Sequence, residues 1–288
     1  MAGTDLRGKV VAITGGARGI GAATATAMHA RGARVAIGDL DPELAQRTAA
    51  EIGGDVLGLP LDVTDHAAFD RFLDAVERQV GPIDVLVNNA GIMPVAPLEE
   101  ETPQTTSRQL AINLHAVIHG TREAMKRMKP RGSGHIVNVA SALGKTGVPG
   151  VATYCGTKFG VLGFSDAVRH ELKGTGVGIS VVLPGMVRTE LTTGMPERGL
   201  VKLLRPEDVA NGIVAGVRAG RFEIHVPRIN GWMERLMRPF GQRIGDRLIS
   251  LVGADQMVLE ASKAQERRAY EARAAASAPA IDAEEAVS

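Results

Sequence analysis

Tyr154 and Lys158 stand four residues apart in the segment Tyr-Cys-Gly-Thr-Lys. On a helix, positions i and i+4 share one face, so this spacing makes a phenol and an ammonium neighbours. A tyrosine phenol has an unperturbed pKa of about 10 and exchanges protons poorly at neutral pH. A lysine charge at about 4.5 Å stabilises the phenolate by roughly 3 to 4 kcal/mol in an effective dielectric of about 20. The pair therefore predicts a lowered Tyr154 pKa and an acid–base catalyst.

A second chemical signal lies near the N-terminus. The apolar run Lys9–Thr14 leads directly into the glycine-rich segment Gly15–Gly21, and a helical stretch follows. Glycines permit a tight turn, and the first helical turn offers free N–H groups and a positive dipole end to a pyrophosphate. Asp39 ends the next strand 18 residues after Gly21, where a carboxylate can accept both hydroxyls of an adenosine ribose. This arrangement predicts a dinucleotide site.

Apolar runs and helical stretches alternate along the chain. Strands are predicted at 9–14, 34–39, 56–62, 84–89, 134–141, 178–183 and 222–226. Helices are predicted at 19–31, 42–52, 66–80, 104–129, 152–174 and 206–219. The alternation predicts an α/β fold: a doubly wound, mostly parallel seven-stranded sheet in a Rossmann-like three-layer sandwich. Ligands of such folds bind at the carboxyl ends of the strands, where we place the glycine turn, Asp39, Asp62, Asn88, Ser141 and Pro184.

With these motifs in view, the chain resembles the short-chain dehydrogenase/reductase family over roughly residues 6–227. Thr14–Gly21 is similar to the cofactor motif of that family. Asn88-Asn-Ala-Gly91 is similar to the element that stabilises its central sheet beside the cofactor. The resemblance implies a cofactor site formed by Gly15, Arg18, Gly19, Ile20, Gly21, Asp39, Asp62, Val63, Asn89, Ala90, Gly91, Tyr154, Lys158, Pro184, Gly185, Val187 and Thr189.

The same resemblance implies a catalytic tetrad of Asn113, Ser141, Tyr154 and Lys158. Tyr154 is expected to act as general base in alcohol oxidation and as general acid in ketone reduction. Lys158 is expected to lower the pKa of Tyr154 and to hold the nicotinamide ribose. Ser141 is expected to hydrogen-bond the substrate oxygen. Asn113 is expected to position a water that links Lys158 to solvent, although an asparagine within a helix is more often simply solvent-facing.

Two residues bear on the choice of cofactor. Asp39 places a carboxylate beside the ribose 2′ position, which repels a 2′-phosphate and favours NAD over NADP. Arg18 acts in the opposite direction, because an arginine in the glycine loop can reach that phosphate. The alternative for Arg18 is a solvated side chain or an ion pair with Asp39. We expect NAD, with NADP as the less favoured cofactor.

The substrate is expected to contact the segment after Pro184. Val187–Leu204 contains Gly194, Pro196 and Gly199 and is predicted to be a mobile loop that closes over the substrate. The side chains there and in two other segments are mostly apolar: Met93, Val95, Leu143, Met186, Leu191, Met195, Leu200 and Leu203. They favour a hydrophobic secondary alcohol or ketone over a sugar or an amino acid. The alternative is that they pack the loop against the domain.

Several other residues are interpreted without a catalytic role. Cys155 follows Tyr154, but successive helical positions point about 100° apart, so we expect a small packed side chain. The seven histidines, among them His115, His119 and His135, show no metal-ligand spacing, and we expect no metal site.

The chain is expected to exceed what the fold needs. We expect a Rossmann-type catalytic domain over residues 1–228, with a cofactor half at about 6–130 and a catalytic and substrate half at about 131–228. A helical extension is expected at 229–275, containing a charged, alanine-rich helix at 255–274, and a disordered tail at 276–288. In the extension, apolar side chains recur every four residues with arginines between them, from Trp232 to Val252. This pattern is explained either by packing on the domain or on a dimer mate, or by peripheral membrane contact through 229–252.

Composition sets broad limits. A formal net charge of +1 gives no reason to expect nucleic acid as a partner. One cysteine excludes an internal disulfide, and with no apolar leader segment we expect a cytoplasmic protein, membrane-associated only if the extension binds lipid. The family resemblance implies a homodimer or homotetramer.

The sequence thus predicts an NAD(P)-dependent short-chain dehydrogenase/reductase acting on CH–OH groups, in which a hydride passes between NAD(H) and a hydrophobic secondary alcohol or ketone. Three alternatives are open: an NADP-dependent ketoreductase, an epimerase or dehydratase on the same scaffold, and a non-catalytic dinucleotide-binding regulatory protein.

Overall fold

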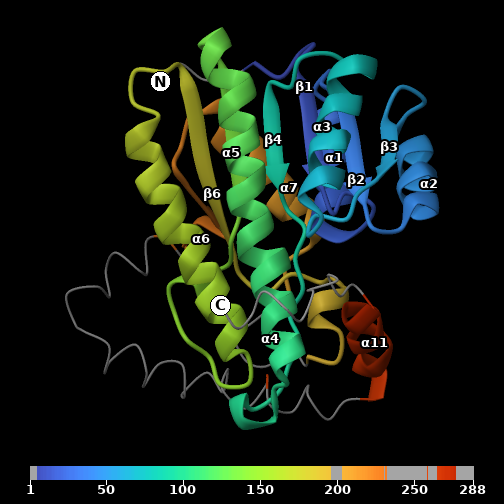
Figure 1. The fold of residues 1–288 in the computed structure, drawn as a ribbon, viewed down its shortest axis with the longest axis vertical. Coiled ribbons are helices and arrows are strands. Elements are labelled where there is room, and N and C mark those ends of the chain that lie inside the picture. Colours follow the sequence, from blue (N-terminus) through green and yellow to red (C-terminus); the bar gives the residue numbers. More distant parts are fainter. Residues whose placement is uncertain (1–4, 196–202, 230, 232–257, 259–264, 277–288) are drawn as a thin grey trace.

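Seven apolar segments pair as one parallel sheet in the order β3-β2-β1-β4-β5-β6-β7 (Figure 1). The coordinates are a computed structural model, which describes residues 5–195, 203–229, 231, 258 and 265–276. The strands are β1 (Val10–Thr14), β2 (Arg34–Asp39), β3 (Leu57–Pro60), β4 (Val85–Asn88), β5 (Gly134–Val139), β6 (Val177–Pro184) and β7 (Glu223–Val226). Each lies within one or two residues of a predicted strand at both ends, and the doubly wound α/β class is confirmed.

Helices cover both faces of the sheet. One face carries α1 (Gly19–His29), α2 (Pro42–Ile52) and α7 (Pro206–Arg218). The other carries α3 (His66–Gln79), α4 (Pro103–Leu110), α5 (Ala116–Met128) and α6 (Ala152–Glu171). A parallel strand connected by helices must return across a face of the sheet, which explains the three layers.

The central strands are buried on both sides. In β1, Val10 and Ala12 pack with the α3 and α5 side chains, whereas Val11 and Ile13 pack with those of α1 and α7. Two-sided burial explains why the strands read as continuous apolar runs. Burying one such side chain stabilises the fold by roughly 1.5 to 3 kcal/mol.

The strand order reverses beside β1. This strand pairs with β2 on one side and with β4 on the other, so the chain runs outward in both directions from the centre. The loops after β1 and β4 therefore diverge and leave a crevice at the carboxyl ends of the strands. That crevice is the expected place for a ligand.

The predicted helix at 104–129 contains a change of winding. A π-helical turn, η2 (Ala111–His115), separates α4 from α5 and contains Asn113. Asn113 is fully buried, so the solvent-facing alternative for this residue is wrong. π-turns occur frequently at functional sites, because the extra residue re-aims a side chain.

The C-terminal extension returns to the body of the protein. A 3-10 turn, η7 (Gln265–Arg267), leads into α11 (Arg268–Ala276), which begins inside the predicted charged helix at 255–274 and ends two residues beyond it. In Figure 1, α11 lies beneath the carboxyl edge of the sheet. The arginine-interleaved segment from Trp232 to Val252 and nearly all of the predicted tail at 276–288 lie outside the described residues.

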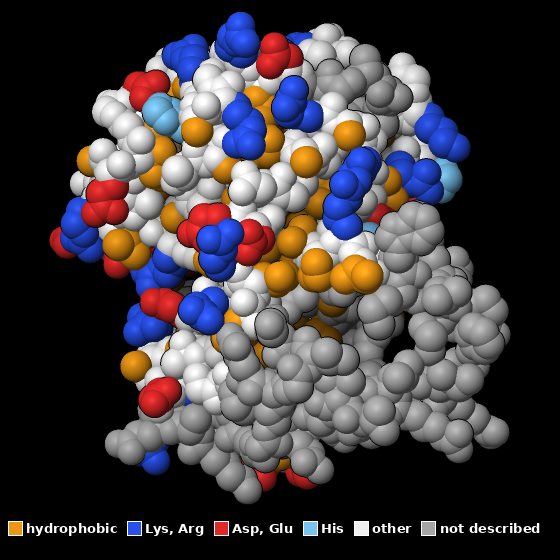
Figure 2. Space-filling view, turned by 180° about the vertical axis from the view of Figure 1, so that it is seen from behind, with side chains coloured by type: hydrophobic (Ala, Val, Ile, Leu, Met, Phe, Trp, Pro, Cys, Tyr) orange, Lys and Arg blue, Asp and Glu red, His pale blue; other side chains and the backbone are white. Residues whose placement is uncertain are grey.

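The described surface gives two further facts. Lys and Arg side chains are interspersed with Asp and Glu on the face in Figure 2, without a continuous basic area. None of the helices in the described part of the chain combines the length and the apolarity needed to cross a membrane.

A buried polar cluster joins the central strands to the helices behind them. Asn138 on β5 accepts from Asn88 Nδ2 at 2.9 Å and from Thr121 Oγ1 at 3.3 Å, and its amide donates to Ser165 Oγ at 3.0 Å. We expect Asn138→Ala to lower the free energy of unfolding by roughly 2 to 4 kcal/mol, because it leaves buried donors and acceptors unpaired. Urea denaturation measures this, with the exposed Lys173→Ala as control. A loss within 0.5 kcal/mol (about the effect of a surface substitution) would contradict the role given to this cluster.

Candidate active site

A cavity of about 1170 Å³ opens at the carboxyl edge of the sheet, at the point where the strand order reverses. This volume exceeds the roughly 300 to 1,000 Å³ of an ordinary small-molecule pocket, so it has room for a dinucleotide together with a substrate. The predicted cofactor residues line it with one exception, Gly21. Of the predicted tetrad, Ser141, Tyr154 and Lys158 line it, and Asn113 does not.

The glycine turn after β1 forms a cradle. Gly15 and Gly19 have φ values of 61° and 54°, which side-chain-bearing residues rarely adopt. A Cβ on Gly15 would lie 2.8 Å from Ala90 Cα, and a Cβ on Gly21 would lie 2.1 Å from Gly15 O. Gly21 therefore acts through close packing of α1 on the turn. Within the described chain no side chain caps α1, and its first turn carries no acidic residue, so its N–H groups and positive end are available to an anion.

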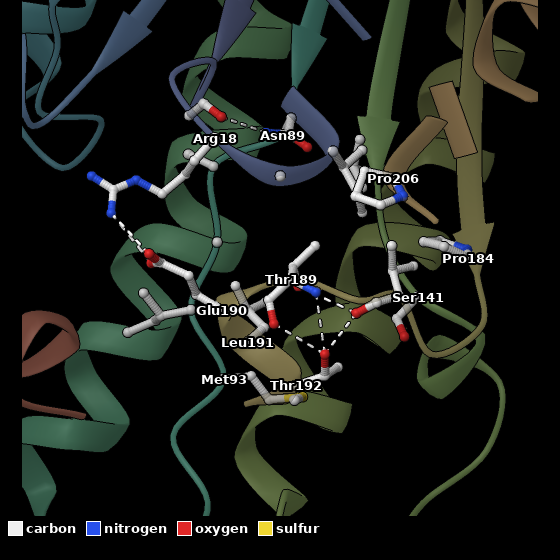
Figure 3. A pocket seen from close by; sticks show the side chains of 18 of the residues that line it. Arg18, Asn89, Met93, Ser141, Pro184, Thr189, Glu190, Leu191, Thr192 and Pro206 are labelled. Atoms are coloured by element: carbon white, nitrogen blue, oxygen red, sulfur yellow. Dashed lines mark hydrogen bonds and ion pairs between the residues drawn. The ribbon is translucent and has the colours of Figure 1, made fainter. Parts of the chain in front are cut away.

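Asp39 and Arg18 have different partners and do not pair with each other. The Asp39 carboxylate accepts from the N–H groups of Ala17 at 3.1 Å and Asp41 at 3.3 Å, which fixes it at the end of β2. Arg18 instead reaches across the cavity to Glu190 at 3.2 Å and lies 3.7 Å from Asp41 (Figure 3). The pair with Asp39, one alternative from the sequence, is not formed, whereas 37% of the Arg18 side chain stays exposed, in line with the solvated alternative. The Glu190 contact joins segments 172 residues apart, which no local pattern reveals.

Hydrogen bonds hold the two inner strand ends together beneath the cradle. Asn89 Nδ2 donates to the carbonyls of Thr14 at 3.0 Å and Gly15 at 2.9 Å. Thr14 Oγ1 accepts from the N–H groups of Asn89 at 3.0 Å and Ala90 at 3.1 Å. These bonds fix the β4 loop against the glycine turn. Asn88 points away into the buried cluster with Asn138, as expected of the sheet-stabilising asparagine.

Asp62 and Val63 line the far side of the cavity, after β3. One Asp62 oxygen, Oδ1, accepts from Thr64 N at 2.9 Å and from Thr64 Oγ1 at 2.7 Å. This contact holds the carboxylate at the cavity wall, where an exocyclic amine can be bound by its other oxygen.

Tyr154 and Lys158 lie side by side on α6, as their spacing predicts, and both are almost fully buried. Lys158 Nζ lies 5.5 Å from the centre of the Tyr154 ring and donates to Val139 O at 3.0 Å. Ser141, just past the end of β5, hydrogen-bonds the Tyr154 hydroxyl. Three groups that could move or hold a proton therefore meet at one point of the cavity.

The predicted lowering of the Tyr154 pKa is wrong for the protein as described. Burial raises the pKa of Tyr154 to about 12, because the phenolate loses hydration, and the Ser141 hydrogen bond opposes this rise only in part. Burial also lowers the pKa of Lys158 to about 8. The sequence estimate assumed a half-solvated pair, whereas the fold buries both groups.

Asn113 lies directly behind the cavity wall. Its Oδ1 accepts from Ile92 N at 2.9 Å and its Nδ2 donates to Ile92 O at 2.8 Å. A Cβ on Gly91 would lie 3.3 Å from Asn113 Oδ1 and 3.7 Å from Lys158 Nζ, so the two side chains flank this glycine. Asn113 thereby sets the path of the chain after β4.

The segment after β6 forms the remaining wall. Pro184, Gly185, Val187 and Thr189 line the cavity, and Val187 bridges to Leu204, which closes the base of the predicted loop. The short helix η5 (Glu190–Thr192) gives this segment regular structure, with Thr192 Oγ1 donating to Val187 O at 2.7 Å (Figure 3). Residues 196–202 of the loop lie outside the described residues.

The end of the cavity around Tyr154 is lined mainly by apolar side chains. A buried cluster there contains Met93, Val95, Val148, Val151, Tyr154, Cys155, Met195 and Val258, with Leu143, Met186 and Leu191 packed against it. Cys155 is a packed side chain, as expected, and burial raises the pKa of its thiol.

Sequence reasoning missed the contribution of the C-terminal extension to this cavity. Val258, Tyr270, Arg273 and Ala274 line it, although this stretch was interpreted only as a charged helix. One signal could have found Tyr270: the chain has only two tyrosines, and both lie in the same cavity.

Two of the histidines are buried, His119 on α5 and His135 on β5. His119 bonds Asp70 at 2.9 Å, and with Glu123 these residues place their ligand atoms within 4.8 Å of one another, away from the cavity. Glu123 is already paired with Lys126 and Arg127, and His119 stacks on His66. His135 is buried in β5, where its ring bonds Ser180 at 2.8 Å and burial lowers its pKa to about 4.

Comparison with known proteins agrees with this geometry. The family model described as short chain dehydrogenase matches residues 9–198. The chain is 37% identical over 219 residues to the 2,5-dichloro-2,5-cyclohexadiene-1,4-diol dehydrogenase LinX of Sphingobium indicum, a match that covers 72% of this chain and 88% of that protein. It is 42% identical over 189 residues to the D-threitol dehydrogenase of Mycolicibacterium smegmatis, covering 65% and 73%. The crystal structure of a short-chain dehydrogenase/reductase from Burkholderia phymatum in complex with NAD superposes with a TM-score of 0.75 at 26% identity, covering 82% and 95%.

The two tyrosines allow a direct test of the electrostatics. Burial raises the pKa of Tyr154 to about 12 and also raises that of Tyr270, so we expect no phenolate absorbance from the folded protein at pH 10. An unfolded sample should be about half ionised there. Because the folded pKa values are raised, the neutral phenols stabilise the fold fully below about pH 10, and this contribution is lost as pH rises toward 12.

Spectrophotometric titration, with circular dichroism to verify folding, measures this. Tyr154→Phe should remove one of the two high-pH transitions. A phenol that ionises below pH 10 in the folded protein would refute the effect assigned to burial.

Proposed function

Because the chain belongs to the short-chain dehydrogenase family, whose relatives are dehydrogenases and reductases acting on CH–OH groups, we propose that it transfers a hydride between NAD(H) and a hydrophobic secondary alcohol or ketone. One observation carries this proposal: Ser141, Tyr154 and Lys158 meet at the apolar end of a cavity whose other end is an uncapped glycine cradle. The first group of residues suits proton transfer, and the second suits a dinucleotide.

The residues around the cradle fit NAD. The free first turn of α1 would hold the pyrophosphate, and Asp39 would accept the ribose hydroxyls. Asp62 would bind the adenine amine, and Lys158 the nicotinamide ribose. The segment from Pro184 to Thr189 would border the nicotinamide ring. When bound, NAD supplies the hydride acceptor in oxidation, and its reduced form supplies the donor in reduction.

Side chains of the protein transfer the proton that accompanies the hydride. In reduction, the Tyr154 hydroxyl donates its proton to the carbonyl oxygen, and a pKa of about 12 keeps it protonated and ready to do so. In oxidation, Tyr154 must first lose its proton, and Lys158 is the cation held against its ring. Ser141 hydrogen-bonds the same substrate oxygen and stabilises the charge that develops on it.

The nature of the cavity wall supports a hydrophobic substrate. The two curated relatives are named for compounds of very different polarity, so their names do not indicate the substrate class of this chain. The side chains around Tyr154 are methionines, valines and leucines, which offer area for apolar contact and few hydrogen-bonding groups. A compound with one reacting oxygen and an apolar body fits this wall.

The proposal also covers oligomeric state and cellular location. Family resemblance favours a homodimer or homotetramer, and the single cysteine favours a cytoplasmic setting. Peripheral membrane contact through 229–252 stays a prediction on residues outside the described part of the chain.

The catalytic role of Tyr154 is tested by Tyr154→Phe, which removes the proton carrier and keeps the ring. We expect turnover to fall by roughly 10²- to 10⁴-fold, as for the loss of a general acid–base group. The measurement follows reduced-cofactor absorbance with a panel of hydrophobic secondary alcohols and their ketones, and NAD binding by calorimetry is the control for folding. Turnover within threefold of the parent, with NAD binding intact, would rule out this mechanism. A parent protein inactive on the whole panel would instead reject the substrate class.

The preference for NAD is tested on Asp39. Since Arg18 is engaged by Glu190 and Asp41, the carboxylate of Asp39 is left to repel a 2′-phosphate, and we expect NADP to bind at least tenfold more weakly than NAD (about 1.4 kcal/mol). Asp39→Ala should reduce the ratio of NAD affinity to NADP affinity about tenfold, mainly because NADP binds more tightly. Calorimetry with both cofactors measures the ratio, and Glu43→Ala, at an exposed acid nearby, should leave it unchanged. Equal or better NADP binding by the parent protein would favour the NADP-dependent ketoreductase.

A further inference from the structure

Arg267 is a buried charge that the C-terminal extension brings to the cavity. Its side chain is almost fully enclosed, with 1% of the residue exposed. Nε donates to Glu271 Oε1 at 2.7 Å, and one terminal nitrogen donates to the carbonyls of Leu191 at 2.8 Å and Thr193 at 3.2 Å. The other terminal nitrogen donates to Met93 O. The guanidinium therefore uses at least four of its five N–H groups.

These contacts join two separate walls of the cavity. Met93 lies in the segment after β4, and Leu191 and Thr193 lie in and after η5. Burying a guanidinium costs free energy of desolvation, and hydrogen bonds from its N–H groups offset that cost. Arg267 keeps this offset only while it contacts both walls at the same time. A lysine could not replace it, because a single ammonium cannot present the planar fork that reaches three carbonyls.

The next turn of the same helix completes the wall. Tyr270 Oη accepts from Met93 N at 2.7 Å, and Glu271 Oε1 accepts from Val95 N at 3.3 Å. The Arg267 guanidinium lies 4.9 Å from the centre of the Tyr270 ring, a cation–π contact. Tyr270 lines the cavity and is close enough to Tyr154 for the two phenols to influence each other electrostatically.

A line of charges ties the helix to the cofactor end as well. Glu190 pairs with Arg273 of α11 at 3.2 Å. It also pairs with Arg18 of the glycine turn at 3.2 Å, as Figure 3 shows. These groups are partly exposed, so the pairs contribute little to stability. They connect α11 to the glycine turn through Glu190.

Arg267 and α11 lie outside the part of the chain that the family model matches, which ends at residue 198. We propose that Arg267 is a positioning residue that holds the 92–95 and 191–193 segments together, and that Tyr270 is the side chain of α11 that contacts the substrate and limits its size. The substrate half of this inference rests on the proposed function, whereas the clamp itself does not.

The clamp is tested on the full-length protein with Arg267→Met, which keeps an unbranched side chain and removes the donors. Hydrogen exchange should show the amides of Met93 and Val95 exchanging at least tenfold faster, because their acceptors on α11 are released. Affinity for NAD, measured by calorimetry, should stay within threefold of the parent. Arg268→Met, at the exposed neighbour, is the matched control and should change neither quantity.

Kinetics with the best alcohol of the hydrophobic panel test the substrate contact. Arg267→Met should raise KM at least tenfold while kcat changes less than threefold, since it removes binding shared by ground and transition states. Tyr270→Ala should shift the preference toward bulkier alcohols, and it keeps the test decisive if the arginine variant does not fold.

Unchanged exchange at Met93 and Val95 would overturn the clamp. Unchanged KM and size preference in Tyr270→Ala would overturn the substrate contact. A parent protein that binds NAD and turns over no alcohol would reject the proposed function and the substrate contact with it, while the exchange result would still decide the clamp.

Discussion

The hydrogen bond from Lys158 Nζ to Val139 O joins the two elements that carry the buried polar groups at one end of the cavity. Val139 is the last residue of β5, and Ser141 follows two residues later, so this one bond places helix α6 against the end of the strand that carries Ser141. Tyr154, one helical turn before Lys158, is thereby brought to the same point. Because the donor is buried and carries a charge, the bond is charge-assisted and geometrically strict.

Burial sets the electrostatic character of this end of the cavity. The apolar wall that would select a hydrophobic substrate also removes water from Tyr154 and Lys158, which raises the pKa of the phenol and lowers that of the amine. Both groups are thus displaced toward their neutral forms. A phenol that stays neutral beside a cavity of low polarity is able to donate its proton. A hydrogen bond made there to a developing oxyanion is stronger than the same bond in water.

The two ends of the cavity are built differently. The cofactor end consists of short local motifs at successive strand ends, held by backbone contacts such as those of Asn89 and Thr14. The apolar end is assembled from segments distant in the chain: the residues after β4, the η5 segment and α11. Arg267 is the residue that these three segments share. A substitution in the extension can therefore alter this end of the cavity while the glycine turn stays as it is.

Periodicity and local motifs allowed the sequence alone to predict the order of strands and helices, the glycine turn and the shared face of Tyr154 and Lys158. These features depend on neighbours within one element, where spacing decides the geometry. Only the tertiary structure decided the direction of the Tyr154 pKa, the partner of Arg18, the inward position of Asn113 and the presence of Tyr270 in the cavity. Each of these depends on what other elements bury or contact, and in a single sequence such long-range packing leaves no periodic pattern to read.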